Sequence, residues 1–212
     1  MITTIIFDVD GTIIDTEEAI LESLQCTLRE ELNMVYAKEE LTFALGIPGK
    51  ETLKKLNVSE PDRILSVWSK AQLAFSNKVK VFEQMNEVIQ QLASKQIQLG
   101  IVTSKTNQEM TDEFEQYGLH GYFAEIITAS DTDKHKPYPD PLLACLEKLD
   151  ADKSNAIYIG DSIYDLQCAK SAGVKFALAL WGSKTQKGFE EADYTLSEPM
   201  DILRLISDCE IL

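Results

Sequence analysis

The chain has 212 residues, of which 44% are hydrophobic and 26% charged, with a formal net charge of −15 and a sequence pI near 4.5. This composition is typical of a globular protein with one large domain or two small ones, and the acidic balance argues against nonspecific binding to nucleic acid or anionic membranes. No signal peptide or transmembrane run is visible, so we expect a cytoplasmic protein. The cysteines are widely spaced without a metal-ligand pattern, which favours reduced thiols and makes zinc improbable: Cys26, Cys145, Cys168 and Cys209.

The chain begins with an apolar run, Ile2–Phe7, which predicts a strand buried on both faces. The run ends in Asp8 and Asp10, and alternate residues of a strand point to the same side unless the chain bends between them. Gly11 then allows a sharp turn. Two carboxylates this close repel each other without a compensating cation, so we expect a divalent metal, and Mg²⁺ suits oxygen ligands. A solvated acidic loop is the alternative interpretation of the two acids alone.

Residues 16–80 show a helical pattern. Apolar residues recur every three or four positions along a long first helix: Ile20, Leu21, Leu24, Leu28 and Leu32. We expect a short helix over 38–45, a turn at 46–49, a helix over 50–56, and a fourth helix with Ser59 as its cap and Pro61 in its first turn. No convincing strand appears here, so this block is predicted to be a small all-helical bundle.

Beyond residue 80, helices and strands alternate. We predict helices over 83–95, 107–117, 141–149, 163–172 and 200–207, and strands over 98–103, 123–128, 156–159 and 175–180, with a short edge strand at 194–196. This alternation favours an α/β fold, a parallel sheet with helices on both faces. The helical block interrupts it, so we expect an inserted domain of residues 16–79 over a core of 1–15 and 80–212, with hinges near Asp15 and Lys80.

Polar residues follow several of the predicted strands. In open α/β sheets, sites form outside the carboxyl ends of the strands, so residues there are expected to meet at one rim. These residues are Asp8 and Asp10 after the first strand, Thr103 and Ser104 after the second, Lys136 in a later loop, and Asp161 and Asp165 after the 156–159 strand. Four separate segments thus deliver acids, hydroxyls and a lysine to one edge of the sheet.

These residues resemble the four motifs of the haloacid dehalogenase-like hydrolase superfamily, in the expected order and over essentially the whole chain. The motifs are Asp8-Val9-Asp10-Gly11-Thr12, Thr103 after an apolar strand, Lys136-Pro137, and Gly160-Asp161-Ser162-Ile163-Tyr164-Asp165. The helical insert is similar to the cap of the phosphoglycolate phosphatase and β-phosphoglucomutase branch. The resemblance implies a Rossmann-like core, a mobile cap domain, Mg²⁺ and phosphoryl transfer.

The resemblance also implies a role for each acid. Asp8 is expected to be the nucleophile that forms an aspartyl-phosphate, and Asp10 the general acid and then the base, with its backbone carbonyl on the metal. Mg²⁺ is expected between Asp8, Asp161 and a phosphate oxygen. Asp165 is expected to be a further ligand or an anchor behind the ligands.

The remaining polar residues are expected to hold the phosphate and the substrate. Lys136 neutralises charge on Asp8, and Thr103 donates a hydrogen bond to phosphate. Backbone amides near Val9, Gly11 and Ser104 add donors, and Gly11, Thr12 and Ser104 are therefore expected to bind the substrate. Lys50 lies in a turn that resembles the cap's substrate-specificity loop, so it is a candidate for binding a carboxylate or second phosphate; an exposed lysine at a helix start is the alternative.

Several of these residues have a purely structural alternative. Thr103 ends a strand and is able to cap the next helix, and Asp165 is able to cap or solvate a helix. Lys136 is alternatively a solvated loop lysine, with Lys134 as a nearby competitor for its role. His135 is expected at the surface.

The sequence therefore predicts a Mg²⁺-dependent phosphatase that hydrolyses small-molecule phosphate monoesters, similar to phosphoglycolate phosphatase. A phosphosugar mutase is the alternative within enzymes, and a non-enzymatic phospho-receiver module is the alternative from another class. A small helical cap admits small molecules rather than phosphoproteins or nucleic acid. We expect a small phosphate ester as partner, no membrane, and a monomer or weak homodimer.

Overall fold

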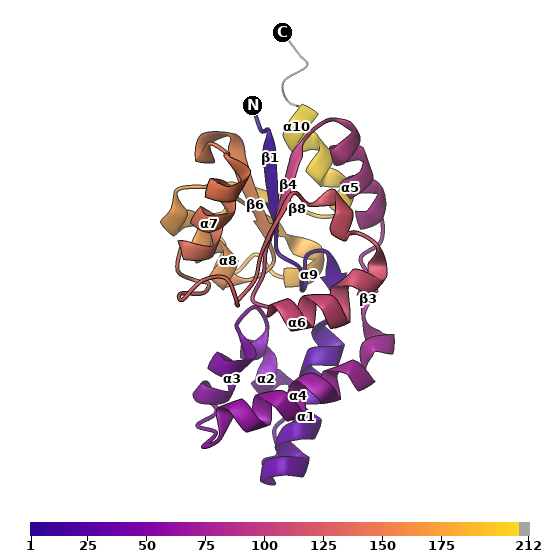
Figure 1. The fold of residues 1–212 in the computed structure, drawn as a ribbon, viewed down its shortest axis with the longest axis vertical. Helices are drawn as coiled ribbons and strands as arrows, with labels where there is room; N and C mark the ends of the chain where they lie inside the picture. Colours follow the sequence, from indigo (N-terminus) through magenta and orange to yellow (C-terminus); the bar gives the residue numbers. More distant parts are fainter. Residues whose placement is uncertain (208–212) are drawn as a thin grey trace.

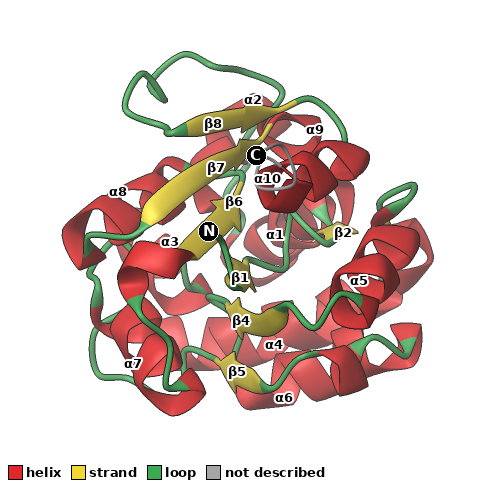
Figure 2. Cartoon of the chain, turned by 90° about the horizontal axis from the view of Figure 1, so that it is seen from above, coloured by secondary structure: helices red, strands yellow, loops and turns green. Residues whose placement is uncertain are grey.

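A six-stranded parallel sheet forms the centre of the molecule, as predicted. The computed structural model describes residues 1–207, and Figure 2 shows the strands of this part side by side in the order β5-β4-β1-β6-β7-β8. Every neighbouring pair is parallel. The strands are β1 (Thr4–Phe7), β4 (Gln98–Val102), β5 (Glu125–Ile127), β6 (Ala156–Gly160), β7 (Lys175–Ala179) and β8 (Tyr194–Leu196). The first strand therefore lies in the middle, between β4 and β6.

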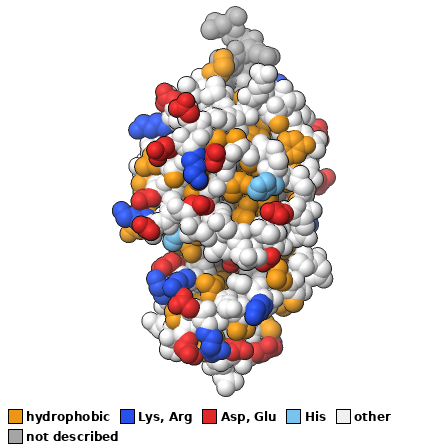
Figure 3. Space-filling model, viewed as in Figure 1, with side chains coloured by type: hydrophobic (Ala, Val, Ile, Leu, Met, Phe, Trp, Pro, Cys, Tyr) orange, Lys and Arg blue, Asp and Glu red, His pale blue; other side chains and the backbone are white. Residues whose placement is uncertain are grey.

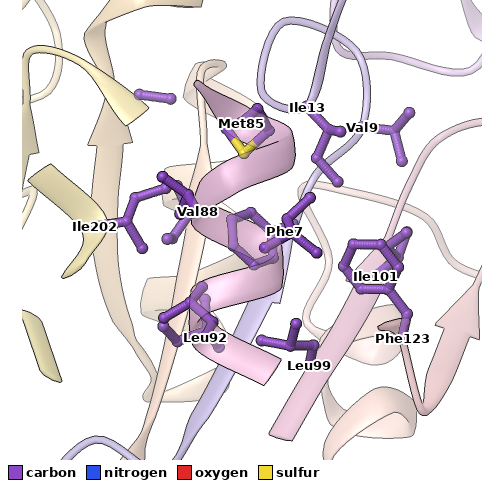
Figure 4. Packing of buried hydrophobic residues seen from close by; sticks show 14 of the residues in the cluster. Phe7, Val9, Ile13, Met85, Val88, Leu92, Leu99, Ile101, Phe123 and Ile202 are labelled. Atoms are coloured by element: carbon purple, nitrogen blue, oxygen red, sulfur yellow. The ribbon is translucent and has the colours of Figure 1, made fainter. Parts of the chain in front are cut away.

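Both faces of the sheet are buried, which explains why its strands are continuously apolar. Phe7 and Ile101 point to one face, where they pack with Met85 and Leu92 of a helix (Figure 4). Ile6 and Val102, one residue earlier or later, belong to the core on the other face. Side chains alternate along a strand, so a strand covered on both sides has apolar residues at every position.

The helices of the core lie on both sides of this sheet (Figure 2). They are α5 (Met85–Ser94), α6 (Asn107–Glu109), α7 (Asp140–Leu149), α8 (Ile163–Ala172), α9 (Leu180–Ser183) and α10 (Arg204–Ser207). The predicted helix over 107–117 is more irregular than expected, because α6 continues as a π-helical turn, Met110–Phe114, and a 3₁₀ turn, Glu115–Tyr117. The predicted last helix begins as a 3₁₀ turn, Pro199–Leu203, and Cys209 lies outside the described residues.

Four helices form the insert after the first strand, in the lower half of Figure 1. They are α1 (Glu17–Leu32), α2 (Lys38–Leu41), α3 (Gly49–Lys55) and α4 (Pro61–Ala74). The insert has an apolar core of its own, to which Leu24, Leu28 and Trp68 contribute. Basic and acidic side chains lie mixed over this half in Figure 3. The residue at the N-cap of α4 is Glu60, so the expectation that Ser59 caps this helix is wrong.

The two connections between the insert and the sheet pair with each other. Short strands β2 (Ile14–Asp15) and β3 (Lys80–Val81) are antiparallel, with Asp15 opposite Lys80. A strand of two residues has no periodicity to recognise, so the sequence did not indicate this pair. The division into a core of 1–15 and 80–212 and a domain of 16–79 stays a prediction. Within the described part of the chain, no helix is both long and apolar enough to cross a membrane.

Candidate active site

Asp8 lies at the carboxyl end of the central strand and is held by Lys136. The Asp8 amide donates to the Ile159 carbonyl of β6 at 2.9 Å, which continues the parallel ladder by one residue. Lys136 Nζ lies 2.9 Å from Asp8 Oδ1 and 2.7 Å from Asp165 Oδ1. The Lys136 side chain is only 1% exposed, so the alternative of a solvated loop lysine is wrong. A buried ammonium needs such partners, because an unpaired buried charge costs several kcal/mol, on the order of 3–5.

Asp165 is the anchor of this ion pair. Its Oδ2 accepts hydrogen bonds from the Ser162 amide at 3.0 Å and from the Ser162 hydroxyl, in a capping box that starts α8. Its Oδ1 accepts from Lys136, and the Tyr158 hydroxyl lies 2.8 Å from the same oxygen. Asp165 therefore caps a helix, which was the alternative interpretation of this residue. It also orients the lysine that contacts Asp8. Tyr158 in β6 was not singled out in the sequence, since it belongs to an apolar strand.

The environment of Asp8 disfavours its charged form. Burial raises the pKa of Asp8 from 3.8 to about 7, against the lowering effect of Lys136, and the negative charges of Asp165 and Asp10 act in the same direction as burial. Burial and the neighbouring acids likewise raise the pKa of Asp161 well above its usual range. A cation bound between these carboxylates would favour their charged forms.

The geometry fits a magnesium ion between Asp8 and Asp161. One carboxylate oxygen from each of Asp8, Asp161 and Asp165 lies within 4.8 Å of the others. Asp161 Oδ1 is buried and has no hydrogen-bond partner among the described residues, so it is available to a ligand. Both oxygens of Asp165 are already engaged. A set of hard carboxylate oxygens with few protein ligands is the donor set that Mg²⁺ prefers.

The turn after β1 leaves room for Asp161. Gly11 has a φ of +75°, and a Cβ at this position would lie 2.2 Å from Asp161 Oδ2. Gly182 of α9 packs on the same turn, where its own Cβ would lie 1.7 Å from the Gly11 carbonyl oxygen. A side chain at either position would displace the acidic cluster, so these glycines serve close approach of two backbone segments.

A second buried lysine holds Asp10. Lys105 Nζ donates to Glu113 Oε2 at 2.5 Å and lies 3.1 Å from Asp10 Oδ1, an ion pair without hydrogen-bond geometry. Burial alone lowers the pKa of Lys105, but the carboxylates of Asp10 and Glu113 raise it above its ordinary value, so the ammonium stays charged. Neither Lys105 nor Glu113 was predicted as a site residue. Lys105 follows Thr103 and Ser104 at the rim, which was the available signal, whereas Glu113 had none.

A cavity of about 50 Å³ lies between the sheet rim and the insert. The core contributes Asp8, Asp10, Ser104, Lys105 and Lys136 to its wall. The insert contributes apolar side chains and two polar ones: Ile20, Ala44, Ile47, Leu65, Trp68, Ser69 and Gln72. Two predicted acids and the predicted lysine thus meet in one partly open cavity with residues from the face of the insert that is turned towards the sheet.

The predicted phosphate donors are arranged less directly. The Thr103 hydroxyl accepts a hydrogen bond from the Lys105 amide at 3.2 Å, and the Ser104 hydroxyl donates to the Gly46 carbonyl of the insert at 3.2 Å. The Gly11 amide donates to the Ile14 carbonyl at 2.8 Å, so it serves the turn. Thr12 is fully buried and does not line the cavity. The helix after β4 is capped by Thr106 rather than by Thr103.

Lys50 is the one predicted site residue that lies apart from the others. Its Nζ pairs with Asp62 Oδ1 at 2.7 Å, with the Lys50 side chain 49% exposed. Lys50 is not in the wall of the cavity. In this structure Lys50 is therefore an exposed lysine at the start of a helix, which was the alternative interpretation.

The fold and the acidic site agree with the family to which the sequence assigns the chain. The chain belongs to the haloacid dehalogenase-like hydrolase family, whose sequence profile matches residues 5–179, which confirms the predicted resemblance. The chain is 32% identical over 212 residues to pyrophosphatase PpaX of Bacillus velezensis, covering 96% of each chain. It is 30% identical over 211 residues to pyrophosphatase PpaX of Oceanobacillus iheyensis, covering 98% of each.

Solved structures agree with this assignment. The crystal structure of a Lactobacillus plantarum protein, provisionally assigned as a phosphoglycolate phosphatase, matches with a TM-score of 0.89. The two sequences are 28% identical, and the match covers 97% of this chain and 99% of the other. The sheet, the insert and their connections therefore follow a known arrangement throughout.

Proposed function

We propose that this protein is a Mg²⁺-dependent phosphatase that hydrolyses small phosphate monoesters through an aspartyl-phosphate on Asp8. The observation that carries the proposal is the setting of Asp8, a buried carboxylate 2.9 Å from Lys136 Nζ and beside Asp161, whose Oδ1 lacks a partner in the described chain. A carboxylate so placed has a cation on one side and open space in the cavity on the other. It is able to attack a phosphorus atom that enters the cavity.

Mg²⁺ would be held by Asp8 and Asp161, where it would offset the repulsion between the carboxylates and a phosphate. Asp165 would hold Lys136 rather than the metal, since its oxygens accept from Lys136 and Ser162. Lys136 would neutralise negative charge on the attacking carboxylate and on the phosphoryl group. The backbone carbonyl of Asp10 as a metal ligand stays a prediction.

Asp10 would provide the proton for the leaving group and then remove one from the attacking water. It lines the same cavity as Asp8 but is held by another lysine, Lys105, so the two acids have separate environments. Environments that differ in this way allow two neighbouring carboxylates to take different roles. Ser104, which lines the cavity, would be a donor of the phosphate site, whereas Gly11, Thr12 and Thr103 would shape the turns beside it; direct contacts of these three with phosphate stay predictions.

The insert would act as a cap that selects substrates by size. The cavity of about 50 Å³ is small and partly open to solvent, and the insert narrows it. Its far wall is mostly apolar, with Ser69 and Gln72 as polar exceptions. A phosphoryl group with a short leaving group fits such a space. A role for Lys50 requires another position of α3 and stays a prediction.

Inorganic pyrophosphate is the second candidate substrate. Its leaving group is a single phosphate, which meets the size limit, and two relatives that cover almost the whole chain are named pyrophosphatases. A phosphosugar mutase would need the phosphoryl group to return to the sugar rather than to water. Membership of a hydrolase family leaves the receiver module without support. The cytoplasmic location and a monomer or weak homodimer stay predictions.

A substrate panel tests the proposal. Phosphate release is measured with phosphoglycolate, pyrophosphate, acetyl phosphate and hexose phosphates, each with Mg²⁺ and with a chelator. We expect Mg²⁺-dependent release from one or more of the small compounds and much slower release from the hexose phosphates. Accumulation of a sugar phosphate isomer without release would favour the mutase. Release that does not depend on Mg²⁺ would contradict the proposed site.

A further inference from the structure

Lys105 is buried at the site, but the proposed reaction assigns it no role. The Lys105 side chain is 5% exposed, and its ammonium lies between Asp10, in the turn after β1, and Glu113 beyond α6. A buried ion pair seldom stabilises a fold more than apolar residues of the same volume would. Orientation of the Asp10 carboxylate is a function that apolar residues would not provide.

Glu113 reaches Lys105 from an irregular part of the chain. It lies in the π-helical turn Met110–Phe114, between Met110 and Phe114, whose side chains are buried in the core below the sheet. The Glu113 side chain is only 9% exposed. A π-helical turn widens the helix by one residue and is often found at functional sites. Here it accompanies a buried acid that faces the site rather than solvent.

The insert contacts this segment through one face of α4. Gln72 Nε2 donates to Glu113 Oε2 at 3.3 Å, and Ser69 Oγ donates to Glu109 Oε1 at 3.4 Å. Gln72 and Ser69 are three residues apart, so they lie on the same side of the helix, and both line the cavity. Figure 1 shows α4 beside α6 at the boundary of the two halves. Glu113 Oε2 therefore accepts from both Gln72 of the insert and Lys105 of the core.

We propose that Lys105 is a positioning residue for Asp10, and that Glu113 and Gln72 make this positioning depend on closure of the insert. With the insert in place, Gln72 holds Glu113, Glu113 holds Lys105, and Lys105 holds the Asp10 carboxylate at the cavity. When the insert moves away, Glu113 loses its amide donor and is free to rotate together with Lys105. Asp10 therefore reaches its working orientation only when the insert is closed, which is also when bulk water is excluded from the cavity. This inference rests on the proposed function.

The test compares two leaving groups in single-turnover phosphorylation with Mg²⁺. Acetyl phosphate releases acetate, which needs no proton, whereas an alkyl phosphate from the panel needs one from Asp10. We expect Lys105→Met to slow phosphorylation by the alkyl phosphate about a hundredfold more than by acetyl phosphate, and Lys105→Arg to recover much of the loss. Gln72→Ala should change the same ratio by about threefold to tenfold.

Lys55→Met is the matched control. Lys55 Nζ donates to the Tyr164 hydroxyl at 2.9 Å, another contact between the insert and the core, but it has no link to Asp10. We expect this variant to affect both substrates equally. An equal effect of Gln72→Ala on both substrates would overturn the coupling to the insert. An equal loss in Lys105→Met, or a change confined to KM, would overturn the positioning role.

The failure of this inference is distinguishable from failure of the proposed function. If the wild-type protein forms a phosphoenzyme from both substrates and the ratio is the same in every variant, only the positioning role falls. If the wild-type protein is phosphorylated by neither of these substrates nor by pyrophosphate, the proposed function falls, and the positioning role falls with it. Circular dichroism of each variant establishes that the ratio is measured on folded protein.

Discussion

The site has two buried lysines, and they connect to different parts of the molecule. Lys136 contacts Asp8, Asp165 and Tyr158, all from the core. Lys105 contacts Asp10 and Glu113, and Glu113 also accepts a hydrogen bond from Gln72 of the insert. The first lysine group is complete without the insert, whereas the second extends into it.

This difference divides the site into a fixed end and an adjustable end. The oxygens that would receive the phosphoryl group and the metal are set by the central strand, the start of α8 and Lys136. The acid that would serve the leaving group is set by residues whose partners include α4. A hydrolase has to hold the phosphate throughout the reaction but admit water only at one step. A fixed end would serve the first requirement, and an end that depends on the insert would serve the second.

Asp8→Asn is expected to have the largest effect on activity. The amide is a poor nucleophile, so phosphate release should fall about a thousandfold or more. The fold should persist, because the amide is uncharged and burial already disfavours the Asp8 carboxylate. Steady-state phosphate release and thermal unfolding measure the two outcomes. Asp150→Asn, at an exposed left-handed position that suits asparagine, is the control and should match wild type. Undiminished turnover by Asp8→Asn would refute the nucleophile.

Replacing each lysine by methionine separates the two groups. Each variant leaves buried carboxylates without a cation, so each should lose about 3–5 kcal/mol of unfolding free energy. Mg²⁺ should stabilise Lys136→Met by more than it stabilises the wild type, since Asp8 and Asp161 would bind it without the neighbouring ammonium. It should stabilise Lys105→Met only about as much as the wild type, because Glu113 lies outside the proposed metal site. Chemical denaturation with and without Mg²⁺ measures this. Equal stabilisation of both variants by Mg²⁺ would remove the distinction between the groups.

The sequence predicted Asp8, Lys136 and Asp165 of the first group but only Asp10 of the second, for a physical reason. Asp8 and Asp165 follow β1 and β6 closely, at the edge where a parallel sheet brings distant segments together, and Lys136 lies in the loop beyond β5. Asp161 was predicted on the same ground. Glu113 lies inside a helical segment, in a π-helical turn. The spacing of apolar residues in the sequence does not predict such a turn, so it gave no sign that Glu113 is buried. Gln72 looked like any polar residue of an amphipathic helix, since its partner belongs to another part of the chain.

The fold was predicted more fully than its details. The order of strands and helices follows from apolar runs and their spacing, and all six strands of the sheet were anticipated. The β2–β3 pair, with Asp15 opposite Lys80, was missed because pairing between two-residue strands leaves no pattern. Lys50 was selected for its place in a turn, but an exposed side chain takes whichever partner is near, and here that partner is Asp62.

A smaller effect is expected at the hinge side of the insert. Glu22 accepts hydrogen bonds from Lys38 and Lys78, and these lower its pKa from 4.5 to about 2. Because the folded pKa lies below the unfolded one, the stabilisation is present above about pH 4.5 and is lost as the pH falls towards 2. Urea denaturation of wild type and Glu22→Gln should therefore differ at pH 7, differ less as the pH falls below 4.5, and converge only at about pH 2 and below. A constant difference would exclude the ion pair as the cause. Solvent screening keeps the effect small.

Lys50→Ala should have the smallest effect. If Lys50 stays with Asp62 during turnover, KM and kcat should remain within about twofold of wild type. Asp62→Ala is the matched variant, because it removes the same exposed ion pair from the other side. A rise in KM for Lys50→Ala alone would show that Lys50 reaches the substrate and would restore the prediction made from its turn.

The central claim is that Asp8 becomes phosphorylated, and chemical trapping tests it most directly. The protein is mixed with Mg²⁺ and the best substrate of the panel, quenched, reduced with borohydride and digested for mass spectrometry. Reduction converts an aspartyl-phosphate into homoserine. We predict homoserine at position 8 in the wild-type protein, at no other aspartate, and only when substrate and Mg²⁺ are both present. Turnover with unmodified Asp8, or with homoserine at Asp10 or Asp161 instead, would contradict the account.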